Sequence, residues 1–256
     1  MGSSNLANLR IHHNADAYSN VFSHLSGGLP NLQSLSLETS YSNFDIRPPD
    51  MRPITLPQLR SLAIKARSMG EWADGFFRNV CMPNLRILTL DGVGIDPDES
   101  EWDSDSDSQE GILEALARLT DRDIMKISPS YRLELDELHF LNFSHNAGVV
   151  LVHRLYTQMA TVKVLTLGPG ALDRNAALVM GLLRLLPTHS GLADFPLPVL
   201  RTLILFDVPR NVVRRIVLQR MSVAGPLEEL FFIERKRISV SQTIGNIKLR
   251  ITISVL

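Results

Sequence analysis

The sequence predicts an α/β fold in which short strands alternate with helices along a repeated unit. Three observations predict it. One pattern of three apolar residues occurs eight times in the 256-residue chain. Its last positions alternate between apolar and variable residues, which is typical of a strand with one buried face. Between the patterns lie stretches whose apolar residues recur three and four positions apart, which is typical of an amphipathic helix.

The repeated pattern is an apolar residue, two variable residues, a second apolar residue, one variable residue and a third apolar residue. Its eight copies begin at Leu6, Leu32, Leu59, Leu85, Leu135, Val162, Leu200 and Leu227. The steps between them are 26, 27, 26, 50, 27, 38 and 27 residues. Chance clustering of apolar residues would rarely give five steps that agree within one residue. A Leu-Pro or Met-Pro pair opens four of the copies, at Leu29, Leu56, Met82 and Leu197.

Helices are predicted between the strands, where apolar residues follow the helical period. These stretches are 17–25, 72–80, 112–119, 149–156, 177–185 and 212–217. A step of 26 or 27 residues leaves room for one strand and one helix.

The spacing and composition of these repeats resemble the leucine-rich repeat family, whose repeats are roughly 20–29 residues long. The resemblance spans nearly the whole chain. It implies a leucine-rich-repeat solenoid, with a curved parallel sheet on the inner side and helices on the outer side. The expected arc has about eight repeats and covers residues 1–237.

Two of the steps are long enough to contain insertions. The 50-residue step holds one repeat and about 24 extra residues, which include the acidic segment 96–110. The 38-residue step holds about 11 extra residues, which we assign to 187–196. Neither insertion should disturb the repeated strands, since long surface loops add little to the entropic cost of folding.

The C-terminus departs from the repeat and predicts a β-hairpin over residues 238–256. Apolar and polar residues alternate on both sides of Gly245-Asn246, which is a two-residue hairpin turn signal. Folding the chain there places Ile244 opposite Ile247, so that apolar residues share one face. We expect this hairpin to cap the apolar core that the last repeat would otherwise expose.

The acidic segment 96–110 holds eight acidic residues and no basic one, which predicts a solvated, disordered insertion. One alternative is a calcium loop, because four acidic residues that begin with Asp103 match positions 1, 3, 5 and 12 of that motif. Ser108 stands where the motif needs glycine, which argues against calcium. A regulatory alternative is phosphorylation of Ser100 and Ser104, each of which precedes an aspartate by three residues, a spacing that acid-directed kinases favour.

Composition and motifs exclude several function classes. Lys and Arg number 26 against 27 Asp and Glu, so a nucleic-acid-binding protein is not expected. No apolar run is long enough to cross a bilayer, and no secretory signal is recognisable. We therefore expect a protein of the cytoplasm or nucleus with no membrane contact. We also expect it to be a monomer. A single cysteine, Cys81, and seven scattered histidines give no metal or catalytic set. The sequence therefore predicts no enzyme and no cofactor.

Outside the acidic segment the chain is basic, with 26 basic residues against 19 acidic ones. Arg210, Arg214 and Arg215 belong to the helix predicted around 212–217. The simplest interpretation is a solvated helix face. The alternative is a site for an acidic partner or for the acidic segment of this chain.

The inner face of the predicted sheet is the best candidate for binding a protein partner. Along each strand, the residues between the apolar positions point away from the core. The predicted partner-binding residues are His139, Leu141, Ile204, Phe206, Phe231 and Ile233. An exposed cluster of apolar side chains is typical of a contact site, unless the C-terminal hairpin folds over it.

Within the leucine-rich repeat family, the Pro-x-Leu-x-x-Leu-x-Leu openings look most like the irregular repeats of fungal-type F-box proteins. The resemblance implies substrate recognition for a cullin-type ubiquitin ligase, whose adaptor would bind an F-box. The F-box itself is not visible in residues 1–256. Alternatives are a repeat regulator of another enzyme, such as a small GTPase, and a structural or degenerate array.

Overall fold

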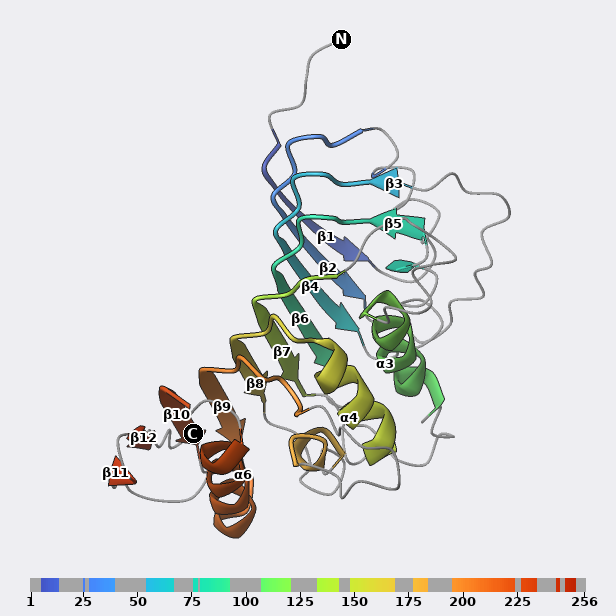
Figure 1. Cartoon of the computed structure of the whole chain (residues 1–256). Helices are drawn as coiled ribbons and strands as arrows, with labels where there is room; N and C mark the ends of the chain where they lie inside the picture. The colour runs from blue at the N-terminus through green and yellow to red at the C-terminus, as the bar shows by residue number, and fades with distance from the viewer. Residues whose placement is uncertain are drawn as a thin grey trace, which may run out of the picture. The chain divides into compact units, whose positions relative to one another are not determined.

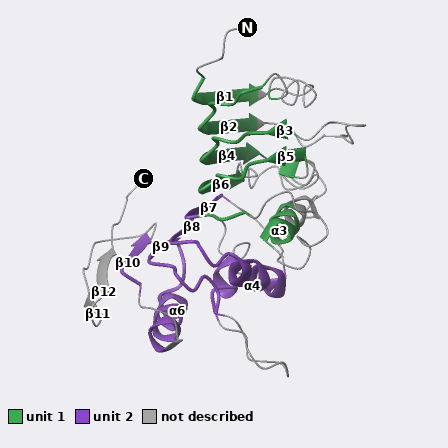
Figure 2. Cartoon of the chain, turned by 45° about the horizontal axis from the view of Figure 1, so that its top comes forward, with its two compact units in different colours: residues 1–135 green, residues 136–256 purple. Residues whose placement is uncertain are grey.

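The chain has an α/β fold with mostly parallel sheets (Figure 1). The computed structural model describes residues 6–13, 25, 28–39, 54–66, 76–77, 79–92, 107–120, 133–142, 148–168, 177–183, 195–223, 227–233, 243–244 and 247–251. The chain divides into two compact units, residues 1–135 and 136–256 (Figure 2). This division falls at the end of the 50-residue step, which contains the longest insertion predicted in the arc over residues 1–237.

The main sheet of unit 1 is parallel, with strand order β1–β2–β4–β6. These strands are β1 (Asn8–His13), β2 (Ser34–Thr39), β4 (Ser61–Ala66) and β6 (Ile87–Gly92). Their register sets the second apolar residues of the repeats side by side: Leu9, Leu35, Leu62 and Leu88. Each step of 26 or 27 residues therefore returns the chain to the same position one strand further along.

A hydrogen-bonded turn explains the proline that opens the repeats. The Leu59 N–H donates to the Leu56 carbonyl oxygen at 3.3 Å, and the same turn starts at Leu29, Met82 and Leu197. Proline fits the second position of such a turn because its ring fixes the backbone angle there. The turn ends where the strand begins, so the Pro-x-Leu signal marks the start of a strand.

The outer side of unit 1 holds a second, two-stranded parallel sheet that the sequence analysis did not predict. Its strands are β3 (Ile54–Thr55) and β5 (Val80–Cys81). The predicted helix over 72–80 is therefore wrong at its C-terminal end, although residues 76–77 and 79 are helical. Both strands contain a β-branched residue and end next to a residue that precedes proline, Leu56 or Met82, which favours extended backbone.

Helix α3 (Asp107–Thr120) confirms the helix predicted at 112–119. It begins earlier than expected, so the last four residues of the acidic segment 96–110 are helical and are not part of a disordered insertion. Acidic residues suit the first turn of a helix because its N-terminus is the positive end of the helix dipole. Ser100, Ser104 and the rest of the segment lie outside the described residues.

The sheet of unit 2 has strand order β7–β8–β9–β10–β12–β11. Its strands are β7 (Glu137–Leu141), β8 (Val164–Leu167), β9 (Thr202–Phe206), β10 (Glu229–Ile233), β12 (Ile247–Ile251) and β11 (Thr243–Ile244). Helices α4 (Val149–Gln158) and α6 (Arg210–Val223) confirm two of the predicted helices. Figure 1 shows both helices along one side of the unit 2 strands.

The apolar positions of the repeat form the core. In the seven copies that begin at Leu32 and later, all three positions are buried, with exposed fractions of 3% or less. The first copy differs, since Leu6 is 40% exposed and Leu9 and Ile11 are half-buried. Burial therefore confirms the pattern and weakens only at the first strand, β1.

The predicted C-terminal hairpin is present. Strands β11 and β12 pair antiparallel, with Ile244 opposite Ile247 as expected. Strand β12 also pairs parallel to β10, where Leu249 lies beside Leu230. The hairpin thus continues the sheet of unit 2 by one more parallel strand and occupies the open edge of β10, while its role as a cap stays a prediction.

One arginine lies in the core of unit 2. Arg220, in the last turn of α6, is 1% exposed and donates hydrogen bonds to the carbonyl oxygens of Pro196 (3.0 Å) and Leu197 (2.8 Å). Its guanidinium carbon lies 5.0 Å from the centre of the Phe195 ring. Burial lowers the pKa of Arg220 to about 10. The hydrogen bonds of the Arg220 side chain therefore link α6 to the segment that leads into strand β9.

Candidate functional site

The inner face of the unit 2 sheet carries the predicted binding residues in adjacent rows. One row contains His139, Thr166, Ile204 and Phe231, each beside the next in the parallel register. In the following row Phe206 lies beside Ile233. Because alternate residues of a strand share a face, both rows lie opposite the core.

Five large apolar side chains on this face form what we call the apolar patch. Its members are Leu141, Ile204, Phe206, Phe231 and Ile233. All five are half-buried, whereas the core residues between them in sequence, such as Leu205 and Phe232, are almost fully buried. The patch is therefore a partly exposed apolar surface built on rigid strands.

Gly168 allows Leu141 to belong to this patch. A Cβ atom at Gly168 would lie 2.7 Å from the Leu141 Cδ2 atom and 3.1 Å from the Phe140 carbonyl oxygen. No side chain larger than hydrogen fits there without displacing the neighbouring strand. Leu141 thus fills the space above strand β8 that a side chain would otherwise occupy, between β7 and β9.

A polar cluster borders the patch. His139 Nδ1 lies 2.8 Å from the Thr166 hydroxyl oxygen, and His139 Nε2 lies 3.3 Å from a Glu137 carboxylate oxygen. Thr166 is 7% exposed, so its hydroxyl is satisfied inside the face and is poorly placed to react with a ligand. His139, predicted as a binding residue, therefore forms the polar rim of the patch and not part of its apolar surface.

The described strands of the hairpin lie beside the patch. The backbone of Arg250 in β12 is the neighbour of Phe231, and that of Lys248 is the neighbour of Glu229. Strand β12 therefore continues the plane of the sheet next to the apolar residues. Residues 243–244 and 247–251 therefore do not fold over the patch, which was the alternative that the sequence left open.

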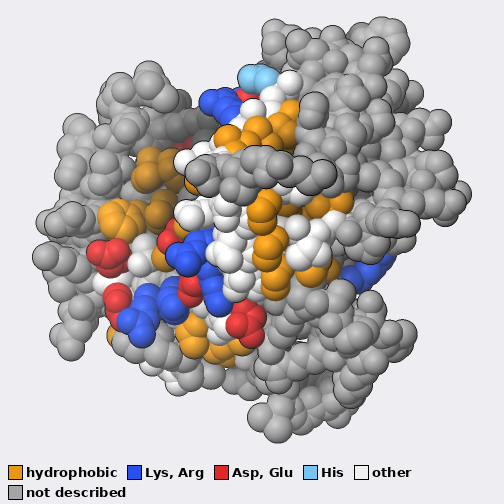
Figure 3. Space-filling view, turned by 90° about the horizontal axis from the view of Figure 1, so that it is seen from above, with side chains coloured by type: hydrophobic (Ala, Val, Ile, Leu, Met, Phe, Trp, Pro, Cys, Tyr) orange, Lys and Arg blue, Asp and Glu red, His pale blue; other side chains and the backbone are white. Residues whose placement is uncertain are grey.

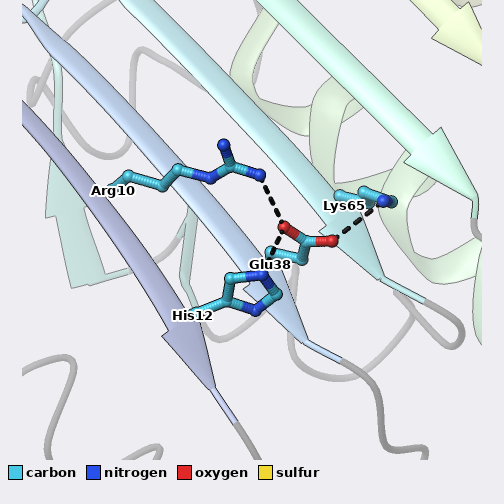
Figure 4. A network of polar contacts seen from close by, with 4 residues as sticks. All are labelled: Arg10, His12, Glu38 and Lys65. Atoms are coloured by element: carbon cyan, nitrogen blue, oxygen red, sulfur yellow. Dashed lines mark hydrogen bonds and ion pairs between the residues drawn. The ribbon is translucent and has the colours of Figure 1, made fainter.

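The inner face of unit 1 is polar and centres on Glu38. Its carboxylate accepts hydrogen bonds from Lys65 Nζ (2.8 Å) and Arg10 Nη2 (2.9 Å), and His12 Nε2 lies 3.0 Å away. Figure 4 shows these three side chains converging on Glu38 from β1 and β4. The hydrogen bonds from Lys65 and Arg10 lower the pKa of Glu38 to about 2. On this face of unit 1 the charged side chains pair with one another, and the described residues there form no apolar cluster.

Acid should remove the contribution of Glu38 to stability. Because its folded pKa is about 2 and its ordinary value is 4.5, the unfolded chain binds the proton first as the pH falls. We expect wild type to melt above Glu38→Gln at pH 7, and the gap to close as the pH falls from about 4.5 toward 2. Thermal unfolding between pH 7 and 2.5 measures this. Glu114→Gln, which breaks an exposed pair with Arg118, is the control, and a Glu38→Gln gap that is the same at every pH would contradict the network.

Charge pairs also link successive repeats near the starts of the strands. Asp136 binds Lys163 at 2.7 Å, and Arg201 lies 3.2 Å from Glu228. Figure 3 shows Lys and Arg side chains next to Asp and Glu side chains, with hydrophobic side chains beside them. In unit 2 the row one pleat before the apolar patch contains Glu137, Thr202 and Glu229, so the patch has a polar border on that side.

The predicted basic cluster lies on helix α6. Arg210, Arg214 and Arg215 are all exposed on it. They are not part of the sheet face that carries the apolar patch, so the structure separates the two predicted binding surfaces.

The remaining predictions concern metals, cysteine chemistry and membranes. Cys81 is half-buried in β5, and burial raises the pKa of its thiol. Within the described ranges, no three His, Cys, Asp or Glu side chains come together as a metal site requires. In the same ranges, no helix has the length and apolar character needed to cross a bilayer.

Sequence reasoning missed two features of the site. It did not predict the Glu38 network, although the charged residues at equivalent positions of three successive repeats were a usable signal. It also overlooked Gly168, whose missing side chain lets Leu141 join the patch. No protein-family model matches the sequence, and no curated protein matches it either.

Proposed function

We propose that this chain is a leucine-rich-repeat-type array that binds a protein partner on the inner face of its unit 2 sheet. The repeated 26–27-residue register, the buried apolar positions and the turn at each Leu-Pro or Met-Pro pair support the repeat assignment. An array of this kind displays one side chain per strand in a regular row. Such rows are suited to binding extended protein surfaces.

The apolar patch is the observation that carries the proposal. Its five large side chains are half-buried on the face opposite the core. Four of them are in the neighbouring strands β9 and β10, about 4.8 Å apart, and Leu141 is in β7, on the other side of β8. Exposed apolar clusters with a polar border are typical of protein contacts, and aromatic anchors usually supply most of the binding free energy. The polar border is provided here by His139, Glu137, Thr202 and Glu229.

Replacing two aromatic residues of the patch should strongly weaken partner capture. Phe206→Ala with Phe231→Ala should weaken binding by about 2 kcal/mol or more, roughly 30-fold. The melting temperature should fall little, because both rings lie outside the core. Quantitative pull-down from cell extract followed by titration with the recovered partner measures the loss.

The matched control removes exposed apolar side chains elsewhere in the same unit. Val150 and Val199 are 72% and 44% exposed, so Val150→Ala with Val199→Ala should leave capture unchanged. Full capture by the Phe206 and Phe231 double variant would place the binding surface elsewhere. Unfolding of that variant would show that the rings belong to the core, which also contradicts the proposal.

The resemblance to F-box proteins gives the captured partner a specific role. In this form of the proposal, the partner is a substrate that a cullin-type ubiquitin ligase modifies. Affinity purification of the full-length protein should then recover a ligase adaptor and a cullin together with the partner. Recovery of a small GTPase without ligase subunits would instead favour a repeat regulator of that enzyme.

A further inference from the structure

Helix α6 has a mixed cationic and apolar surface that is separate from the apolar patch. Arg214 and Arg215 are exposed, and so are Leu218 (51%) and Met221 (45%). These four residues, which we call the α6 surface, are spaced so that they share one side of the helix. The described residues that line a shallow hollow there are Asn211, Arg214, Arg215, Leu218 and Gln219.

The arginine side chains of this surface have no partner among the described residues. Neither the Arg214 nor the Arg215 side chain forms an ion pair or hydrogen bond within the described parts of the chain. Other described arginines are paired, for example Arg10 with Glu38 and Arg201 with Glu228. The guanidinium groups of Arg214 and Arg215 therefore keep their donors for a ligand.

The placement of these charges works against the stability of the helix. Arg210 is the first residue of α6, at the positive end of the helix dipole, and the first turn contains no acidic residue. Arg210 and Arg214 are also four residues apart, where like charges repel. Sequences break such local rules mainly at functional sites, so this cluster points to binding.

We propose that the α6 surface binds an acidic amphipathic helix of a partner protein. Carboxylates match the planar guanidinium groups of Arg214 and Arg215, which can bind them with two hydrogen bonds each. Leu218 lies one helical turn, about 6 Å, beyond Arg214, so the ligand needs an apolar residue about one turn from its acidic residues. An anionic membrane is a poorer match, because the broad apolar side of α6 is already buried in the core and only two apolar side chains remain for insertion.

A displayed library of helical peptides, selected against the immobilised full chain, tests this proposal. We expect the selected sequences to share acidic residues within one turn of a large apolar residue. Their affinity should fall at least about tenfold for Arg214→Glu with Arg215→Glu and about fivefold for Leu218→Ala with Met221→Ala. The charge reversal replaces the repulsion between positions 210 and 214 with an attraction, so it should not lower the melting temperature. A loss of binding in this variant would therefore not result from unfolding.

Arg154→Glu on helix α4, an exposed residue outside the surface, makes the same charge reversal at one site, half the change in net charge of the double variant, and should leave peptide affinity unchanged. Selected sequences that lack acidic residues, or that bind the reversed variant equally well, would overturn the proposal. It would also be overturned if vesicles containing phosphatidylserine bound through α6 while no acidic peptide did. Preferential binding of a peptide with the sequence of residues 96–110 would overturn it as well, because the surface would then belong to this chain's own acidic segment.

Discussion

Replacing Arg220 with alanine should lower the free energy of unfolding by about 3 kcal/mol. The change removes a side chain that is 1% exposed, together with its hydrogen bonds to the carbonyl oxygens of Pro196 and Leu197. It also leaves a cavity beneath the Phe195 ring. Urea unfolding of wild type and variant, followed by circular dichroism, measures the difference.

Two further variants separate the causes of this effect. Arg214→Ala on the same helix removes an exposed guanidinium and should change stability by no more than about 0.5 kcal/mol. Arg220→Met keeps most of the side-chain volume but not the donors, so its cost should lie between those of the two alanine variants. If Arg220→Ala unfolded at the same urea concentration as Arg214→Ala, the buried contacts of Arg220 would contribute nothing to the free energy of unfolding. The stabilising role assigned to Arg220 in the core would then be wrong.

Truncating the chain after Glu234 should destabilise unit 2 and cause aggregation. The truncation removes β12, which pairs with four residues of β10 from Glu229 to Phe232. Strand β10 then becomes an open edge, and open edges of regular strands promote association between molecules. A loss of a few kcal/mol would lower the melting temperature on the order of 10 °C for a chain of this size. Differential scanning fluorimetry and size-exclusion chromatography measure both effects.

A chain that ends at Ile251 is the control for this truncation, because it keeps β12 and its pairing with β10. It should melt close to wild type and remain monomeric. A soluble monomer with an unchanged melting temperature after truncation at Glu234 would refute the role of the hairpin as a cap.

The strands and their register were predictable from the sequence because one physical rule determines them. Every copy of the pattern places apolar residues at the same offsets, and a parallel pairing that shifted by one residue would move Leu62 or Leu203 from the core to the opposite face. The hairpin followed from the same rule together with a two-residue turn signal at Gly245-Asn246. The rows on the inner face, including the pairing of Phe231 with Ile204, follow directly from this register.

The segments between the main strands were less predictable, because short segments depend on their neighbours. The strands β3 and β5 contain two residues each, too few to show a period, and pair only because their repeats lie side by side. Arg220 shows a different limit. It occupies the buried stripe of α6 together with Val213, Ile216 and Val217. A charged residue is rarely buried unless it is paired, and the carbonyl acceptors of Arg220 come from a segment 23 and 24 residues away.

The central claim is that a protein partner binds the apolar patch on the inner face of unit 2. Site-specific photocrosslinking tests it most directly, with a photoreactive amino acid placed at Phe206 in one version of the full chain and at Val150, on helix α4, in another. Both versions are exposed to the same cell extract, and crosslinked products are identified by mass spectrometry. We expect one partner to be crosslinked from position 206 and not from position 150. Crosslinking from position 150 alone, or equally from both positions, would contradict the assignment of the patch as the binding surface.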